Sequence, residues 1–165
     1  MVTELYPFSS NIFQIEKYHY HYLDEGSNGE PLLMLHGNPT WSFYYRNLIL
    51  GLKDSYRCVV PDHMGMGFSD KPQNYPYTLS QHIDNLEKLL DQIKLDNITL
   101  VVHDWGGPIG MGFAVRHPER VKRLVIFNTA AFLSREIPLS LKLCRLPGFG
   151  PIAIRMLNAF ARTAT

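Results

Sequence analysis

The chain has 165 residues, of which 45% are hydrophobic and 19% charged, the size and composition of one globular domain with a buried core. Sixteen Lys and Arg residues against fifteen Asp and Glu residues leave a formal charge of +1, so the charge balance gives no reason to expect a nucleic-acid partner. No apolar run is long enough to cross a bilayer, and two cysteines cannot build a disulfide framework. The N-terminus has neither a basic start nor a long apolar stretch, so we expect no secretory signal. We therefore expect a soluble cytoplasmic protein without a membrane partner.

Short apolar runs predict the strands of a sheet. The first pattern is an alternation over residues 18–22, with tyrosines on one face of a strand and His19 and His21 on the other. The later runs are apolar on both faces, as central parallel strands need because helices cover both sides of such a sheet. In chain order these runs are Leu32–Leu35, Cys58–Val60, Ile98–Val102 and Leu124–Phe127.

Helices are expected between the strands, at about residues 41–52, 79–93 and 108–116. The second has the clearest pattern, because its apolar residues recur at the spacing of one helix face. Strands that alternate with helices indicate an α/β fold with right-handed crossovers, here a mostly parallel, doubly wound sheet.

From Ala130 onward, prolines and glycines break the chain into short pieces. The last piece has an apolar helical face that fits either a membrane-surface helix or a helix packed on its own protein. We favour the second, because two arginines are few for membrane binding. The residues of this face are Ala153, Met156, Leu157 and Phe160.

The most informative stretch runs from Leu100 to Gly110. An apolar strand ends at His103, and small residues then open a helix, which is the layout of a nucleophile elbow. Asp104 occupies the nucleophile position. The more familiar elbow carries Ser there and a further Gly two places earlier, where this chain has Val102. Taken alone, the same residues also fit a helix N-cap followed by a loop.

Two further motifs follow predicted strands. Residues 36–41 read His-Gly-Asn-Pro-Thr-Trp, and residues 61–72 form a loop that contains Gly65 and Gly67. Loops at the carboxyl ends of strands in a doubly wound sheet converge on one crevice, so we expect all three motifs at one site.

In this order and spacing the three motifs resemble the N-terminal half of an α/β-hydrolase, most of all the haloalkane dehalogenases. The resemblance extends from about Phe8 to Phe132. Epoxide hydrolases share the His-Asp-Trp-Gly-Gly elbow but usually carry another residue at the position of Asn38. The β-lactone decarboxylases of olefin biosynthesis are also similar and rank second. The resemblance implies an α/β-hydrolase fold with an N-terminal core part, residues 1–130, and the start of a helical cap domain, residues 131–165.

The resemblance also implies a chemistry. Asp104 would displace halide from a small apolar haloalkane and form an alkyl ester on the enzyme. The side-chain amide of Asn38 and the indole N–H of Trp105 would hold the halide product. The backbone N–H groups of the same two residues would form the oxyanion hole for hydrolysis of the ester. No metal and no other cofactor is implied.

The second step of that chemistry needs a histidine to activate water and an acid to orient the histidine. In the family this histidine lies downstream of the cap, and none of the seven histidines here matches its position. In one subgroup the acid would fall at Asn128, which cannot serve. We therefore expect a chain that is truncated within the cap region and lacks a C-terminal half. The alternative is a half-domain that is non-catalytic or depends on a partner.

Other polar residues in the predicted loops and strands have simpler explanations. His19 and His21 would be two metal ligands without a third, and they fit ordinary strand residues better. Asp62 is expected to tie its glycine-bearing loop rather than to catalyse. His36 and His63 are expected to brace the crevice loops through hydrogen bonds.

Overall fold

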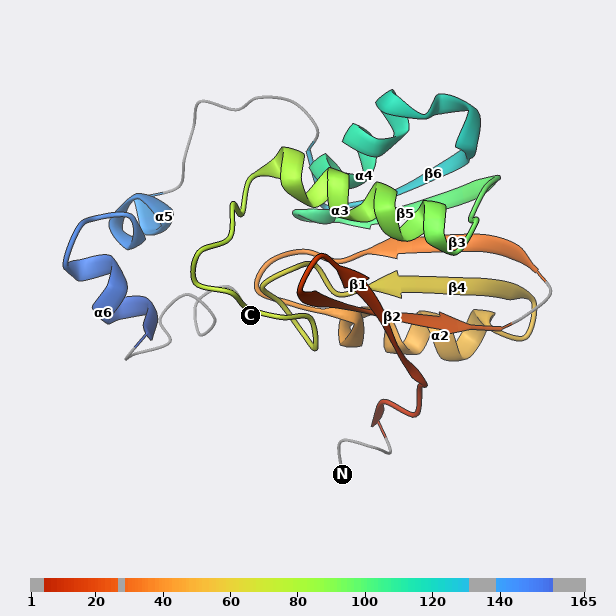
Figure 1. Ribbon diagram of the computed structural model, residues 1–165, viewed down its shortest axis with the longest axis horizontal. Coiled ribbons are helices and arrows are strands. Elements are labelled where there is room, and N and C mark those ends of the chain that lie inside the picture. Colours follow the sequence, from red (N-terminus) through yellow and green to blue (C-terminus); the bar gives the residue numbers. More distant parts are fainter. Residues whose placement is uncertain (1–4, 27–28, 131–138, 156–165) are drawn as a thin grey trace. The chain divides into compact units, whose positions relative to one another are not determined.

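The computed structural model describes residues 5–26, 29–130 and 139–155, and Figure 1 shows its elements in chain order. The chain divides into two compact units, Met1–Ala131 and Phe132–Thr165. Across the described residues, no helix combines the length and the apolarity that crossing a membrane requires.

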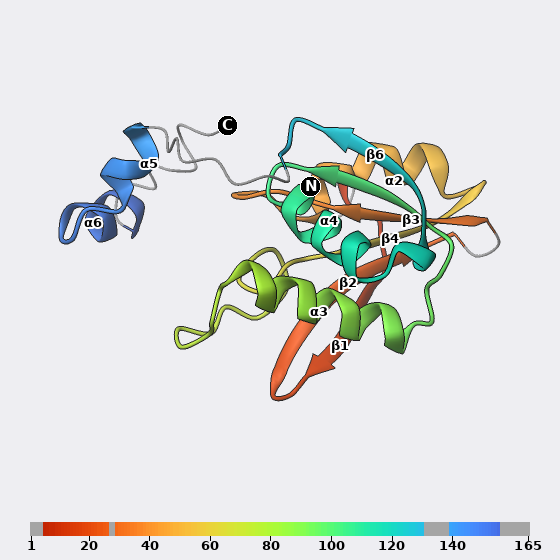
Figure 2. The same cartoon turned by 90° about the horizontal axis from the view of Figure 1, so that it is seen from above.

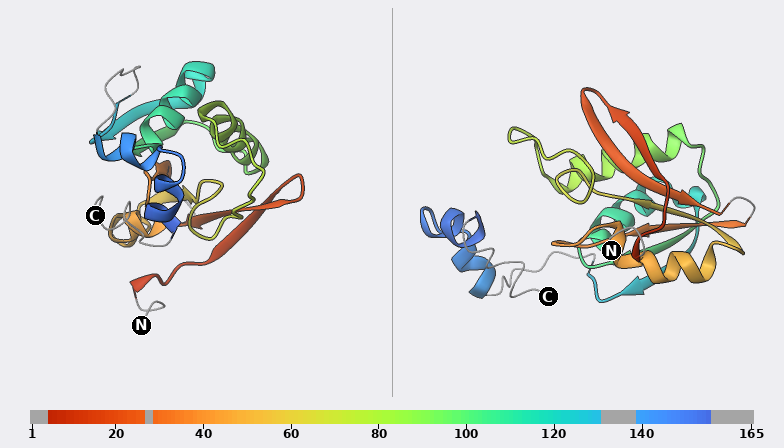
Figure 3. Two further views of the ribbon diagram at one scale, coloured as in Figure 1. Left: turned by 90° about the vertical axis from the view of Figure 1, so that its left-hand side faces the viewer. Right: turned by 90° about the horizontal axis from the view of Figure 1, so that it is seen from below.

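The first unit is built on a sheet whose strands lie in the order β1-β2-β4-β3-β5-β6. The strands are β1 (Ser10–Ile15), β2 (Tyr18–Glu25), β3 (Glu30–Leu35), β4 (Tyr56–Pro61), β5 (Ile98–His103) and β6 (Val121–Phe127). β1 and β2 form an antiparallel hairpin at one edge (Figure 3), and β2 is antiparallel to β4. The strands β4, β3, β5 and β6 are parallel, so their carboxyl ends meet at one edge of the sheet.

Helices cover both faces of this sheet (Figure 2). They are the 3₁₀ helix η1 (Ser42–Tyr45), α2 (Arg46–Leu52), α3 (Leu79–Gln92), α4 (Gly106–Arg116) and the 3₁₀ helix η2 (Pro118–Arg120). The alternating side chains of β3 separate two core layers. Leu33 and Leu35 pack with residues of α3 and α4, whereas Leu32 and Met34 pack with residues of η1 and α2.

The four apolar runs form β3 to β6 and the alternating segment lies in β2, which confirms the predicted α/β sheet. Strand β1 is not predicted, because Ser10, Asn11 and Gln14 dilute its apolar pattern and pairing with β2 creates the strand. The helix expected over residues 41–52 is divided at Arg46 into a 3₁₀ helix and α2. Helix α4 begins at Gly106, two residues before the predicted start at residue 108.

β6 lies at an edge of the sheet and is exposed along most of its length. An apolar run of this kind is typical of a central strand, but among the described residues β6 pairs with β5 alone. The side chains of its last four residues, Leu124–Phe127, are between 38% and 53% exposed. An unpaired edge with this composition is a template for pairing with another chain.

We therefore expect the chain, expressed alone, to self-associate through β6. Ile126→Lys should shift it toward the monomer in sedimentation velocity, because a charge on an edge strand opposes pairing with another edge. Val115→Lys is the matched control: Val115 is 82% exposed on α4 and should leave association unchanged. A wild-type chain that is monomeric with a sharp thermal transition contradicts this prediction.

The second unit is described over residues 139–155. It contains α5 (Leu139–Cys144) and α6 (Phe149–Arg155), joined through Gly148 in a left-handed conformation with φ +80°. Three residues of the predicted apolar face, Met156, Leu157 and Phe160, lie outside the described residues. The assignment of residues 131–165 to a cap domain stays a prediction.

Candidate active site

β5 ends in a tight turn that carries Asp104. Its φ of +48° is uncommon for a residue with a Cβ atom. The backbone N–H of Asp104 donates to the carbonyl of Asn128 at 3.3 Å, and its carbonyl accepts from the backbone N–H of Gly107 at 3.0 Å and from the hydroxyl of Thr129 at 2.6 Å. These bonds tie the turn to α4 and to the segment after β6. A sparsely populated conformation held from several sides is typical of functional positions.

The close approach of three backbone segments explains two glycines at this turn. A Cβ atom on Gly37 would lie 2.7 Å from Cγ of Asp104 and closer still to its Cβ and Oδ1. A Cβ atom on Gly106 would lie 2.9 Å from the carbonyl oxygen of His36 and closer to that of Leu35. The sequence pattern indicates no separate role for Gly37, because only the folded chain places it against Asp104.

The loop after β3 brings Asn38 to Asp104. The backbone N–H of Asn38 donates to Oδ1 of Asp104 at 2.7 Å. Both residues are exposed, and among the described residues no donor bonds to Oδ2. The carboxylate is therefore held at one oxygen, while the other remains available to a ligand.

Trp105 follows Asp104 directly and precedes α4. Its side chain is 37% exposed. Within the described ranges, neither the indole N–H of Trp105 nor the side-chain amide of Asn38 donates a hydrogen bond. The backbone N–H of Trp105 makes no hydrogen bond to the carboxylate of Asp104 in these ranges. The structure thus brings Asp104, Asn38 and Trp105 to one place and shows one of the two expected backbone donors. Their catalytic roles stay predictions.

A buried carboxylate, Asp62, supports the loops around this site. It accepts hydrogen bonds from the backbone N–H groups of Ser42 at 2.7 Å and Phe68 at 2.9 Å, and Nδ1 of His21 lies 2.9 Å from it. Burial by itself raises the pKa of Asp62, but the hydrogen bonds from His21, Phe68 and Ser42 outweigh burial and hold that pKa below its ordinary value of 3.8. The predicted role in tying the glycine-bearing loop is confirmed.

His36 connects two loops from inside the protein. Its Nδ1 donates to the carbonyl of Gly37 at 2.8 Å, and its Nε2 accepts from the backbone N–H of His63 at 3.1 Å, as expected for a bracing residue. The same expectation is wrong for the side chain of His63, whose two ring nitrogens have no hydrogen-bond partner in the described part of the chain. Burial, with His36 and His82 nearby, lowers the pKa of His63 well below its ordinary value of 6.5.

His19 and His21 lie on the same face of β2 but do not share a site. His21 is buried, and its Nε2 lies 3.0 Å from Oγ of Ser10. His19 is exposed, with Nδ1 3.9 Å from a carboxylate oxygen of Asp70. Among the described residues, no group of three or more His, Cys, Asp and Glu side chains is arranged to hold a metal ion.

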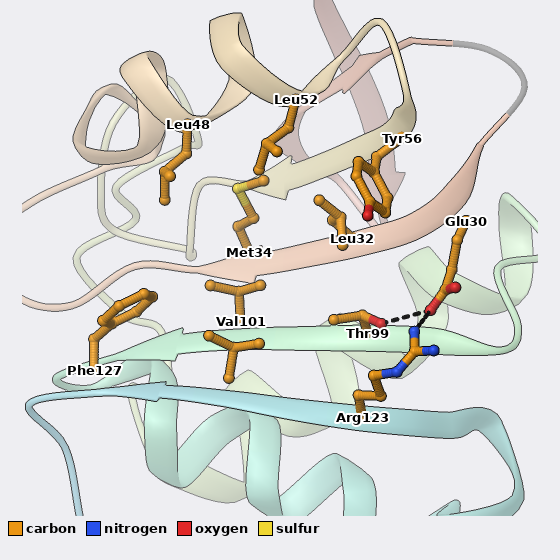
Figure 4. Close-up of a pocket in the computed structure, with 11 residues that line it drawn as sticks. Glu30, Leu32, Met34, Leu48, Leu52, Tyr56, Thr99, Val101, Arg123 and Phe127 are labelled. Atoms are coloured by element: carbon orange, nitrogen blue, oxygen red, sulfur yellow. Dashed lines mark hydrogen bonds and ion pairs between the residues drawn. The ribbon is translucent and has the colours of Figure 1, made fainter.

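A cavity of about 480 Å³ lies beside α2 on the sheet face that this helix partly covers (Figure 4). Its walls are apolar side chains of α2 and of the sheet, except at one end. There Glu30 accepts a hydrogen bond from Thr99 at 2.8 Å and another from Arg123. Asp104 does not line this cavity, so the cavity is separate from the site around the nucleophile elbow.

Comparison with known proteins shows the family. Residues 30–143 match the family model described as alpha/beta hydrolase fold. The chain belongs to this family. It is 52% identical over its whole length to the cis-3-alkyl-4-alkyloxetan-2-one decarboxylase of Shewanella oneidensis, of which it covers 54%. It is 44% identical over 126 residues to haloalkane dehalogenase 2 of Mycobacterium tuberculosis, a match that covers 76% of this chain and 44% of that protein.

The solved structures agree with this assignment. The haloalkane dehalogenase DatA from Agrobacterium tumefaciens C58 matches with a TM-score of 0.83 and 30% identity, over 94% of this chain and 55% of that chain. The predicted α/β-hydrolase fold and the resemblance to haloalkane dehalogenases and β-lactone decarboxylases are confirmed. The chain spans about half the length of the curated relatives it matches.

Proposed function

We propose that this chain supplies the nucleophile of an enzyme that attacks a saturated carbon atom bearing a leaving group, and that Asp104 is this nucleophile. The observation that carries the proposal is the 2.7 Å hydrogen bond from the Asn38 N–H to Oδ1 of Asp104, on a backbone held at a φ of +48°. A carboxylate held at Oδ1 can attack through Oδ2, and the bond formed is an ester. The N–H then faces the ester carbonyl, where negative charge develops if the ester is hydrolysed.

The names of two relatives, an oxetanone decarboxylase and a haloalkane dehalogenase, indicate substrates that share one chemical feature. Each substrate has a saturated carbon bonded to a group that leaves as an anion. In the oxetanone this group is the ring carboxylate, and in the haloalkane it is halide. One carboxylate nucleophile therefore serves both reactions.

We favour a dialkyl oxetan-2-one, a four-membered β-lactone, as the substrate. The 52% identity to the decarboxylase extends over the whole chain, whereas the match to the dehalogenase covers 76% of it. In the first step Oδ2 of Asp104 bonds to C4 of the ring, the C4–O bond breaks, and the ring oxygen leaves as a carboxylate attached to C3.

The second step of the lactone reaction consumes no water. The bond between C3 and the carboxylate breaks, CO₂ leaves, and the electron pair forms a double bond between C3 and C4. The bond from C4 to Asp104 breaks at the same time, which restores the Asp104 carboxylate. This sequence of steps needs no water-activating base, because no ester is hydrolysed.

A haloalkane is the second candidate substrate, supported by two uncharged donors beside Asp104, the amide of Asn38 and the indole of Trp105. In this case the ester must be hydrolysed by an activated water. Within the described residues no histidine side chain hydrogen-bonds to Asp104: the ring of His103 stacks on Tyr44 with a 4.5 Å centroid distance. We therefore expect the alkyl ester to persist on this chain.

The test compares two substrates on the 165-residue chain. With 1-bromohexane we expect a stable hexyl adduct on the peptide that contains Asp104, detected by mass spectrometry. With a cis-3,4-dialkyl oxetan-2-one we expect alkene and CO₂, detected by gas chromatography, and no stable adduct. Asp104→Asn should lower both by at least about 10³-fold, since an amide is a poor nucleophile.

Asp54→Asn is the matched control, because Asp54 is an exposed carboxylate after α2, far from the elbow in the sequence. It should leave both reactions unchanged. If 1-bromohexane gives the adduct but the oxetan-2-one gives no alkene, the haloalkane is the substrate class. A chain with native circular dichroism that reacts with neither compound, or an adduct that survives in Asp104→Asn, overturns the assignment of the nucleophile.

A further inference from the structure

The two ring nitrogens of His36 make different hydrogen bonds. Nδ1 faces the carbonyl oxygen of Gly37 at 2.8 Å and therefore carries the proton, because a carbonyl only accepts. Nε2 faces the backbone N–H of His63 at 3.1 Å and is therefore unprotonated, because an N–H only donates. The side chain is fully buried. These contacts select one neutral tautomer of His36.

The bond to Gly37 acts directly on the group that binds Asp104. The carbonyl of Gly37 and the N–H of Asn38 belong to the same peptide unit, which is planar, so in the trans form the two groups point in opposite directions. His36 holds the oxygen end of this unit, with a weaker bond from the backbone N–H of Thr40 at 3.3 Å. The nitrogen end donates to Oδ1 of Asp104 at 2.7 Å. Rotation of the unit would break both bonds together.

We propose that neutral His36 is a positioning residue, which orients the Gly37–Asn38 peptide so that the N–H of Asn38 donates a hydrogen bond to the carboxylate of Asp104. The expected effect of His36 on reaction rate rests on the proposed function, in which Asp104 is the nucleophile. The hydrogen-bond geometry around His36 does not depend on that function. His36 touches no substrate and acts through Asn38. The bond from the His63 N–H fixes the ring, so the loop after β4 determines the orientation of the loop after β3.

Protonation of His36 would undo this arrangement. A proton on Nε2 would face the N–H of His63, which places two donors against each other. Burial disfavours the cation and lowers the pKa of His36, although the carbonyl of Gly37 and the carboxylates of Asp62 and Asp104 act in the opposite direction. The titratable groups that face His36 from the elements packed around it are Asp62 and His63 after β4, His103 at the end of β5, Asp104 after β5, and His82 of α3 beyond the ring of His63.

The first test measures the Asn38 N–H without any reaction. Pro39 has no N–H, so a proteolytic fragment that ends at Pro39 has Asn38 as its last exchanging amide in hydrogen–deuterium exchange. His36→Leu, which makes neither bond, should speed exchange at Asn38 by about tenfold or more. His36→Gln, whose amide oxygen can accept from the His63 N–H, should restore slow exchange at least in part. His82→Phe is the matched control, a buried histidine of α3 outside these bonds, and should leave exchange unchanged.

The second test measures alkylation of Asp104 by 1-bromohexane. His36→Leu should lower the limiting rate of alkylation by about 10- to 100-fold with little change in the half-saturating concentration, because orientation and not binding is lost. The rate of the wild-type chain should fall on acidification as His36 takes up a proton. The rate of His36→Gln should stay level further into the acid range, because glutamine does not titrate.

The outcomes separate this proposal from the proposed function. Slow exchange at Asn38 in a folded His36→Leu chain overturns the proposal. If His36→Leu does not fold, His36→Gln decides: an acid profile identical to that of the wild-type chain overturns it. If Asp104 is never alkylated but exchange at Asn38 follows His36 as expected, the positioning role stands and the proposed nucleophile fails.

Discussion

Gly106→Ala is expected to lower the free energy of unfolding by about 3 kcal/mol. Gly106 opens α4, and an added Cβ atom would overlap the backbone carbonyl of Leu35 at the end of β3. A backbone carbonyl in a central strand cannot move aside as the end of a flexible side chain can. Either α4 must shift away from the sheet or the turn at Asp104 must rearrange. Urea denaturation followed by far-UV circular dichroism at pH 7.5 measures the loss.

Gly51→Ala is the matched control for this prediction. Gly51 also lies in a helix, α2, but no atom lies within 4 Å of an added Cβ. Alanine should therefore raise the free energy of unfolding by about 0.5–1 kcal/mol, because it restricts the unfolded chain. If the two variants differ by less than about 1 kcal/mol, the contact between α4 and β3 is not as close as described.

The free energy of unfolding is expected to fall as the pH decreases below 6.5. The pKa values of His36, His63 and His82 are lowered from 6.5, chiefly by burial, so these side chains stay neutral in the folded chain. Unfolding exposes them, and below 6.5 the unfolded chain then binds more protons than the folded chain. The stabilisation is therefore complete above 6.5 and is lost as the pH falls through and below that value. Each such proton contributes a slope of about 1.4 kcal/mol per pH unit.

His63→Leu isolates the largest of these contributions. Among the described residues the ring of His63 makes no hydrogen bond, and burial, with His36 and His82 nearby, lowers its pKa well below the ordinary value of 6.5. The slope of the free energy of unfolding near pH 5.5 should fall by about 1.4 kcal/mol per pH unit in His63→Leu. Equal slopes in wild type and His63→Leu contradict a neutral buried His63.

Local patterns in the sequence were sufficient for the central strands, for α3 and for the position of Asp104 at the end of β5. Their apolar periods reflect burial on one or both faces, and such a period is visible within each segment by itself. Strand β1 has no such period, because its pairing with β2 and not its own pattern makes it a strand. The exposed state of β6 also depends on its neighbours, since an apolar run fits a central or an edge strand until the sheet order is known.

The candidate site, like the fold, was determined partly by the sequence and partly by the tertiary structure. The sequence by itself determined which residue types stand at the carboxyl ends of the strands, and with them the resemblance that singles out Asp104, Asn38 and Trp105. Only the tertiary structure decided that Asn38 donates through its backbone to Oδ1 of Asp104 and that His36 holds the other end of the same peptide. The bond from Asn38 to Asp104 joins residues 66 apart, and the bond from His63 that fixes the ring of His36 joins residues 27 apart. Such bonds leave no local period in a sequence, because their geometry arises when β3, β4 and β5 align side by side.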